Sequence, residues 1–68
     1  MLVISTRKVP RLRDLTAAEL EDLWLSVRRV QAIVNGVHGA TANDIGLQDG
    51  PDAGQSVPHV HIHVLPRK

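Results

Sequence analysis

The chain has 68 residues, enough for one small domain, and its lack of cysteine excludes a disulfide framework and a thiolate metal site. Apolar residues make up 43% of it, too many for a disordered polymer, and Trp24 is its only aromatic side chain of the Phe, Trp and Tyr class, so an aliphatic core is expected. The net charge of +1 gives little attraction to nucleic acid or to an anionic membrane. No apolar run approaches the roughly 18 residues of a membrane span. We therefore expect one intracellular domain that engages neither nucleic acid nor membrane.

The first predicted element is a short strand at Leu2-Val3-Ile4, and Pro10 with the basic residues around it predicts a loop. The positive charges in this segment come from Arg7, Lys8, Arg11 and Arg13. Two interpretations of them are open: a solvated loop, or a cluster that steers a phosphate ligand.

A long helix follows. Thr16 and Glu19 have the spacing of a capping box, which predicts the start of the helix at this point. Asn35-Gly36 predicts its end and leaves His38 in a solvated loop. Apolar residues at steps of three and four form one stripe that we expect to pack on a sheet, with the tryptophan as a core anchor: Leu20, Leu23, Trp24, Val27, Val30 and Val34.

Two further strands are predicted, at residues 42–48 and 57–65. Asp49-Gly50-Pro51 supplies the turn chemistry between them, and Pro66 should close the ladder of the second. One long helix beside several short strands, without βαβ alternation, predicts the α+β class, with the helix packed on an antiparallel sheet.

Three of the four histidines, His59, His61 and His63, lie on every second residue of the last predicted strand. Successive side chains of a strand point to opposite faces, so the three imidazoles share one face. The alternating Val60, Ile62 and Val64 share the other, which we expect to face the helix. The histidine face must meet water, a ligand or another chain, because imidazoles without partners are costly in an apolar core.

Three interpretations of the histidine face are open. Same-face histidines can converge on a transition metal, although a closed zinc site needs a fourth ligand, from a carboxylate or His38, at a position that the sequence does not fix. The face can also be a solvated surface on which histidine is incidental. In the third interpretation one imidazole is a nucleophile toward phosphorus or carbonyl carbon, and its neighbours donate protons where charge develops.

The residues before the histidines favour the third interpretation. Gly54 permits close backbone approach, and Gln55 and Ser56 offer neutral hydrogen-bond donors. Gln48 can add another amide from the preceding strand. Donors beside an imidazole suit a phosphate, and we expect no bound metal ion.

The stretch from Gln48 to Lys68 closely resembles the histidine-triad (HIT) superfamily, whose hallmark is His-φ-His-φ-His-φ-φ with φ apolar. The flanking letters QDGPDAGQS and LPRK resemble the fragile-histidine-triad branch, the dinucleoside triphosphate hydrolases of the bis(5'-adenosyl)-triphosphatase type. The preceding strand, basic loop and helix also look like that branch, so the resemblance covers essentially all 68 residues.

The resemblance implies a HIT-like fold and hydrolysis of diadenosine triphosphate-like substrates through a nucleotidyl-histidine intermediate. It makes His61 the nucleophile on the α-phosphorus, His63 a hydrogen-bond partner of the phosphate region and His59 a supporting residue. It also implies that Gln48 contacts the ligand and that Leu2 is part of the apolar wall for the base. The residues implied to line the phosphate groove are Gly54, Gln55, Ser56 and Val57.

The sequence also departs from the family pattern. The Gly-His pair that precedes the first strand in the family is missing, as are an upstream nucleoside-binding section and the region after the histidines. We expect residues 1–68 to be a partial domain, about the middle half of such an enzyme, with weak or no turnover unless it dimerises. The alternatives are a nucleotide-binding module without hydrolysis, a phosphoramidate hydrolase and a nucleotidyl transferase.

The resemblance further implies a nucleotide substrate, a homodimer and a location in the cytoplasm or nucleus. No cofactor is expected, apart from a divalent cation that could arrive with the substrate phosphates.

Overall fold

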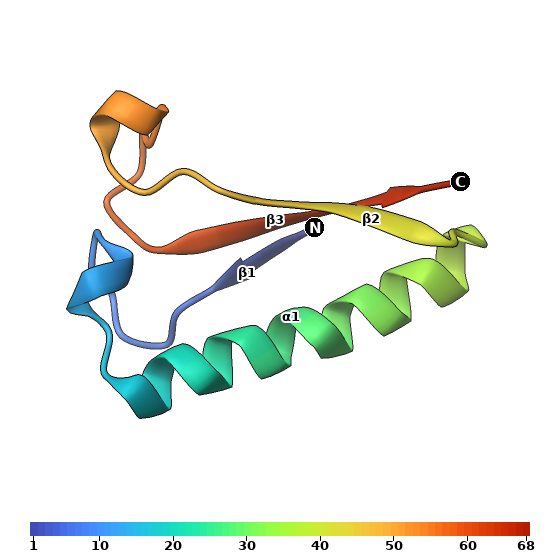
Figure 1. Ribbon diagram of the computed structural model, residues 1–68, viewed down its shortest axis with the longest axis horizontal. Helices are drawn as coiled ribbons and strands as arrows, with labels where there is room; N and C mark the ends of the chain where they lie inside the picture. Colours follow the sequence, from blue (N-terminus) through green and yellow to red (C-terminus); the bar gives the residue numbers. More distant parts are fainter.

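The computed structural model describes all residues, 1–68. Along the chain come β1 (Leu2–Ile4), a 3-10 turn (Leu12–Asp14), α1 (Ala17–His38), β2 (Ala42–Leu47), a second 3-10 turn (Pro51–Ala53) and β3 (His61–Arg67). The three strands form one antiparallel sheet in the order β1-β3-β2, and α1 runs along one side of it (Figure 1). The predicted α+β architecture is confirmed, with the histidine strand at the centre of the sheet.

The strand register decides which side chains face α1. Val3 of β1 and Leu47 of β2 both lie opposite Ile62 of β3, and residues opposite each other in an antiparallel pair share a face. Ile62 is fully buried, as are Val60 and Val64 on the same side. The apolar side of β3 therefore faces the helix, as predicted, and the histidine side faces outward.

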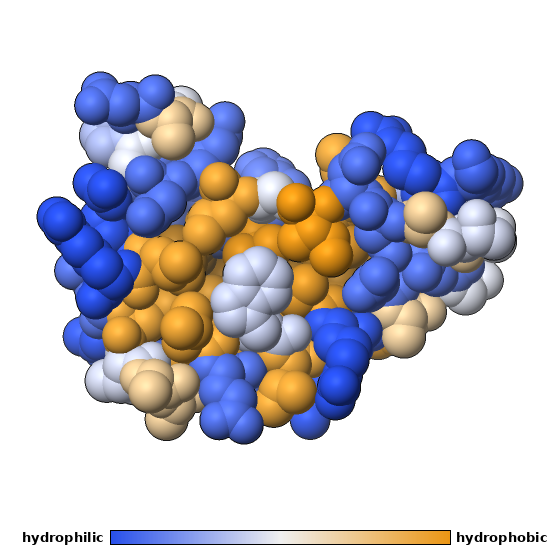
Figure 2. Space-filling model, viewed as in Figure 1, coloured by the Kyte–Doolittle hydropathy of each residue, from blue (hydrophilic) through white to orange (hydrophobic).

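Leu23 and Val27 of α1 are part of the core, each 3% exposed, and Val34 is buried about two turns beyond Val27. Trp24 is 43% exposed, so its prediction as a core anchor was wrong. It lies about 100° around the helix from Leu23, on the flank of the buried stripe. Figure 2 shows the result as an apolar surface left uncovered between α1 and the sheet.

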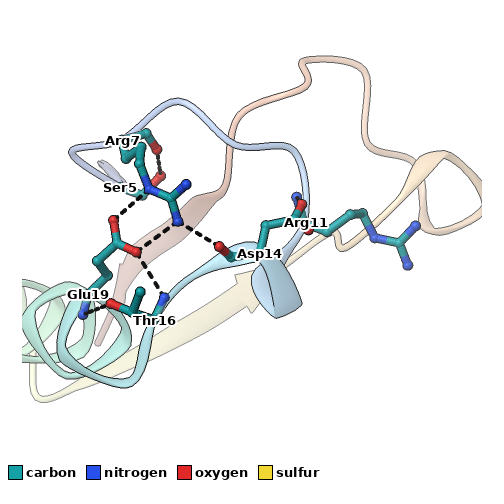
Figure 3. A network of polar contacts seen from close by, with 6 residues as sticks. All are labelled: Ser5, Arg7, Arg11, Asp14, Thr16 and Glu19. Atoms are coloured by element: carbon teal, nitrogen blue, oxygen red, sulfur yellow. Dashed lines mark hydrogen bonds and ion pairs between the residues drawn. The ribbon is translucent and has the colours of Figure 1, made fainter.

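The start of α1 is the predicted one. The Glu19 amide donates to Thr16 Oγ1 over 3.2 Å, and the Thr16 amide donates to Glu19 Oε1 over 2.8 Å, which completes the capping box. Arg7 adds two bonds of 2.9 Å to the Glu19 carboxylate and one of 2.7 Å to the Asp14 carbonyl (Figure 3). These partners, Arg7 first and the Thr16 amide second, lower the pKa of Glu19 to about 2.

The end of α1 differs from the prediction. The helix continues through Asn35 and Gly36 to His38 and ends at Gly39, which has the left-handed φ of 63°. His38 is therefore the last helical residue and not part of a loop. The Asn35 side chain accepts a 2.9 Å hydrogen bond from Asn43 at the start of β2, so it ties the helix to the sheet.

The strand bounds also shift. β2 ends at Leu47, one residue early, and β3 covers His61–Arg67 where 57–65 was predicted, so Pro66 lies inside it. The amide of Val64 donates toward β1, to the Met1 carbonyl. Pro66 follows Val64 by two residues, so its nitrogen also faces away from β2, and the ladder with β2 is intact.

None of the helices combines the length and the apolar character that crossing a bilayer demands.

The Arg7–Glu19 pair predicts an acid-dependent contribution to stability. Because the low pKa belongs to the folded state, this contribution is fully present above the usual value of 4.5 and is lost as the pH falls toward about 2. Glu19→Gln keeps a capping-box side chain but not the charge. The melting temperature of the native chain, measured by circular dichroism, should exceed that of Glu19→Gln at pH 6 and approach it near pH 2. A difference that stays constant over this range would contradict the assignment.

Candidate functional site

The outward face of β3 carries His61 and His63. On β1, Ile4 lies opposite His61 and Leu2 opposite His63, and on β2 Gly46 lies opposite His63. The face is thus a pair of imidazoles flanked by aliphatic side chains on one edge and by a residue without a side chain on the other.

His59 lies two residues before β3 begins, so its predicted place within the strand was wrong. It still shares a hollow with His61, although residues 57–59 form a bend in which the His59 amide donates to the Val57 carbonyl over 2.8 Å. The Val60 amide donates to the Val9 carbonyl over 2.9 Å, and the Ser5 amide donates to the Val60 carbonyl over 3.2 Å. Backbone pairing therefore continues one residue before the regular strand, to Val60, and does not include His59.

Both rings of this hollow are oriented by backbone carbonyls. His61 Nδ1 lies 2.7 Å from the His59 carbonyl oxygen, and His59 Nε2 lies 2.8 Å from the Ser5 carbonyl oxygen. A carbonyl oxygen only accepts, so each of these ring nitrogens donates its N–H. In the neutral ring of His61 this places the proton on Nδ1 and leaves the lone pair on Nε2.

His63 stands next to His61 on the same face. The two ring centroids are 5.3 Å apart and the ring planes meet at 81°, edge to face. A second imidazole is thus within reach of oxygen atoms on a group that is bound at His61 Nε2. This is the arrangement that proton donation to a phosphoryl or acyl group requires.

The hollow at His61 has a volume of about 140 Å³, and its lining joins two imidazoles to three aliphatic side chains: Leu2, Ile4, Val57, His59 and His61. Leu2 and Val57 were predicted site residues, and the structure brings both to the nucleophile candidate. Ile4 was missed. The signal was in the sequence, because Ile4 follows Leu2 by two residues on the same strand and so shares its face.

Gln48 and Gly54 meet on the other side of His63. Gln48 lines a hollow of about 340 Å³ together with His63. Gly54 has a φ of 94°, and a Cβ placed on it would lie 2.7 Å from Gln48 Nε2. Gly54 was expected to permit a close approach, and the group that approaches it is the side-chain amide of Gln48.

The other residues predicted to line the phosphate groove do not share one site. The Gln55 amide is engaged at both ends, since Oε1 accepts from the Gly50 amide over 2.8 Å and Nε2 donates to the Pro10 carbonyl over 2.7 Å. Ser56 is exposed and lines a third hollow, apart from the one that contains Val57. Gln55 thus fixes the loop, while Ser56 and Val57 border two separate hollows.

The chain contains no group of three or more His, Asp or Glu side chains placed to hold a metal ion. In the histidine face itself, His59 Nε2 and His61 Nδ1 are directed at different carbonyl oxygens.

The sequence model of the HIT domain matches residues 1–68. The chain belongs to the HIT domain family. Among relatives of this HIT domain, the asymmetrical bis(5'-nucleosyl)-tetraphosphatase of Schizosaccharomyces pombe is 60% identical over the whole chain, which covers 37% of that protein. The bifunctional bis(5'-adenosyl)-triphosphatase/adenylylsulfatase FHIT of Arabidopsis thaliana is 53% identical, again over the whole chain and over 38% of the relative. The chain thus spans little more than a third of these relatives.

Solved HIT structures have the same fold. The Caenorhabditis elegans NitFhit protein superposes with a TM-score of 0.95 at 55% identity, over 98% of this chain and 16% of that one. The Plasmodium falciparum diadenosine triphosphate hydrolase, solved in complex with cyclomarin A, superposes with a TM-score of 0.94 at 37% identity, over 98% of this chain and 46% of that one. The identification as a HIT domain of the fragile-histidine-triad type agrees with the sequence resemblance.

Replacement of Gly54 by alanine should destabilise the fold by about 1–3 kcal/mol, because an L-residue is strained at this φ, and the Gln48 side-chain amide would have to move away from the new Cβ. Gly36→Ala is the matched control, since Gly36 is helical and a Cβ there meets nothing within 4 Å. That change should raise stability by about 0.5–1 kcal/mol. Urea denaturation followed by circular dichroism measures both, and equal effects of the two changes would refute the role of Gly54.

Proposed function

We propose that this HIT domain hydrolyses dinucleoside polyphosphates at the α-phosphorus, with His61 as the nucleophile. The observation that carries the proposal is the 2.7 Å contact between His61 Nδ1 and the His59 carbonyl, which leaves the Nε2 lone pair for attack. Relatives with the same family fold bear names of bis(5'-nucleosyl)-polyphosphate hydrolases. Those proteins are longer than this chain, so their activity enters here as a proposal.

In the first proposed step, the His61 Nε2 lone pair forms a bond to the α-phosphorus and the bond from phosphorus to the bridging oxygen breaks. The leaving nucleotide departs with that electron pair and takes a proton from a neighbouring donor. The Nδ1–H bond to the His59 carbonyl stabilises the positive charge that develops on the ring. Water then attacks the same phosphorus, the P–N bond breaks, and a nucleoside monophosphate and the neutral imidazole are released.

The surrounding residues suit the other parts of such a substrate. Leu2 and Ile4 offer aliphatic surface to a nucleobase, and His63 is the imidazole placed to donate to the phosphoryl oxygens. Gln48 lies beside His63 and can donate its amide to the same phosphate region. The nucleophile is a side chain, so the proposed reaction needs no cofactor, and a divalent cation would enter with the polyphosphate as part of the substrate.

The covalent step can be tested with a radioactive α-phosphate. The chain is incubated with labelled diadenosine triphosphate or tetraphosphate, quenched and examined for released AMP and for acid-labile label on the protein. We expect label on the native chain and none on His61→Ala. His38→Ala, which alters an exposed histidine at the end of α1, should retain label within about twofold, because a surface change away from a site has little effect.

Label on His61→Ala would refute the assignment of the nucleophile. Thermal stabilisation of the native chain by AMP without any released product would support the alternative of a nucleotide-binding module.

We also propose that the domain forms a homodimer in the cytoplasm or nucleus. β2 pairs with β3 on one side only, and this six-residue edge has neither Pro nor Lys to discourage pairing with another chain. Light scattering should give about twice the chain mass of 7.4 kDa, and Ile45→Lys should give one chain mass because a charge replaces a half-exposed apolar residue of β2. A native chain that remains monomeric at millimolar concentration would exclude the dimer.

A further inference from the structure

Two arginines of the basic cluster, Arg7 and Arg11, have different partners in the structure. Arg7 is used by the helix start, where its guanidinium pairs with Glu19. The Arg11 amide donates to Asp14 Oδ2 over 3.0 Å, but the Arg11 guanidinium takes no part in these contacts, and Figure 3 shows it directed away from the Arg7–Glu19 pair. It extends instead toward the second 3-10 turn, which lies at the same end of the sheet as the first (Figure 1). Arg11 is thus an arginine of this loop whose charge is not explained by the helix cap.

The Arg11 guanidinium lies flat against Gly50. A Cβ on Gly50 would be 2.8 Å from the Arg11 Cζ, 2.9 Å from Nη1 and 3.1 Å from Nη2. Gly50 also has a φ of 105°, a backbone conformation that favours glycine. The absence of a side chain at Gly50 therefore leaves the space that the guanidinium occupies.

The hydrogen-bonding capacity of this guanidinium is largely unused. Arg11 Nε is buried and has no hydrogen-bond partner, and the Asp49 carboxylate lies 3.4 Å away, as an ion-pair contact only. The Asp49 oxygen concerned, Oδ1, already accepts a 2.9 Å hydrogen bond from the Leu12 amide. That bond and the two hydrogen bonds of the Gln55 side chain connect the basic loop to the second 3-10 turn. The N–H donors of the Arg11 guanidinium are not needed for this connection.

The guanidinium borders a hollow of about 370 Å³, whose lining is polar side chains and proline rings with no acidic residue: Pro10, Arg11, Pro51, Gln55, Ser56 and Pro58. Ser56 and Pro58 line this hollow, and the alternate residues Val57 and His59 line the hollow of His61. The chain at residues 55–59, which bends at residues 57–59, therefore borders both hollows. A chain of phosphates that crosses this segment would pass from the nucleophile to the Arg11 guanidinium.

We propose that the Arg11 hollow is the subsite for the phosphates of the departing nucleotide, with the Arg11 guanidinium as their cation and Ser56 as a neutral donor. The inference rests on the proposed function, since it concerns the part of the polyphosphate beyond the cleaved bond. A guanidinium offers a planar pair of donors that matches phosphate oxygens. The subsite would favour substrates that have enough phosphates to reach it and would contribute nothing to the binding of a nucleoside monophosphate.

The test uses calorimetric titration of the full chain with inorganic tripolyphosphate and, separately, with AMP. Arg11→Gln should weaken the binding of tripolyphosphate by about tenfold or more, because a hydrogen-bonded ion pair with phosphate is lost. The same change should leave the affinity for AMP within about twofold. Arg13→Gln is the matched control, since it removes an equal charge from an exposed residue of the same loop and should alter neither affinity by more than about twofold.

A second variant separates ligand binding from loop structure. Asp49→Asn keeps Oδ1 as an acceptor for the Leu12 amide but removes the negative charge beside Arg11. It should strengthen tripolyphosphate binding, the opposite direction to Arg11→Gln. A purely structural role of Arg11 would make both variants bind less, with lower melting temperatures, and that result would overturn the proposal. Equal losses from Arg11→Gln and Arg13→Gln, or no binding of tripolyphosphate by the native chain, would overturn it too.

Failure of the subsite proposal and failure of the proposed function would give different results. If His61 acquires label but Arg11→Gln binds tripolyphosphate like the native chain, the subsite alone is refuted. If Arg11→Gln selectively loses tripolyphosphate while His61 never acquires label, the anion subsite stands and the hydrolytic proposal fails.

Discussion

The register in which β3 pairs with β1 and β2 decides which of its side chains are buried under α1 and which face outward. Val60, Ile62 and Val64 are all fully buried, and removing such side chains from water contributes about 1.5–3 kcal/mol each. A slip of one residue would bury the imidazoles and expose the aliphatic side chains. The energy that holds the helix on the sheet is therefore the same energy that holds the histidines on the open face.

The orientation of the histidines is a second consequence of this pairing. His61 donates to the carbonyl of His59, and His59 donates to the carbonyl of Ser5, just past the end of β1. Both acceptors are backbone atoms just outside the paired strands, Ser5 one residue after β1 and His59 two residues before β3. The tautomer of the proposed nucleophile thus depends on a backbone carbonyl and needs no acidic partner, which explains why the site contains imidazoles, amides and hydroxyls but no carboxylate against His61.

Features that depend on neighbours in sequence were predictable. The capping box of Thr16 and Glu19 involves residues three apart, and the alternation of β3 follows from the chain geometry of a strand. The end of α1 was not predictable in the same way, because Gly36 and Gly39 are both candidate stops and the choice depends on the tie between Asn35 and Asn43 across the turn.

Features that depend on distant parts of the chain were beyond the sequence. Trp24 fits the apolar stripe of α1, yet its burial depends on where the sheet lies, and the sheet covers Leu23 and Val27 more fully. The contact of Arg11 with Gly50 and the bond from Gln55 to Pro10 join segments about forty residues apart. No local pattern in the basic loop indicates which arginine pairs with the helix and which extends to the turn.

The strand order β1-β3-β2 has a consequence for how the molecule assembles. β1 and β2 have no ladder with each other, so every pairing in the sheet involves β3, the last of the three along the chain. During synthesis β1 and β2 cannot pair in this sheet until β3 has been made. The pairing of β1 with β3 joins residues far apart in sequence, and such contacts slow folding. The histidine strand is therefore the one element that joins β1 and β2 in this sheet.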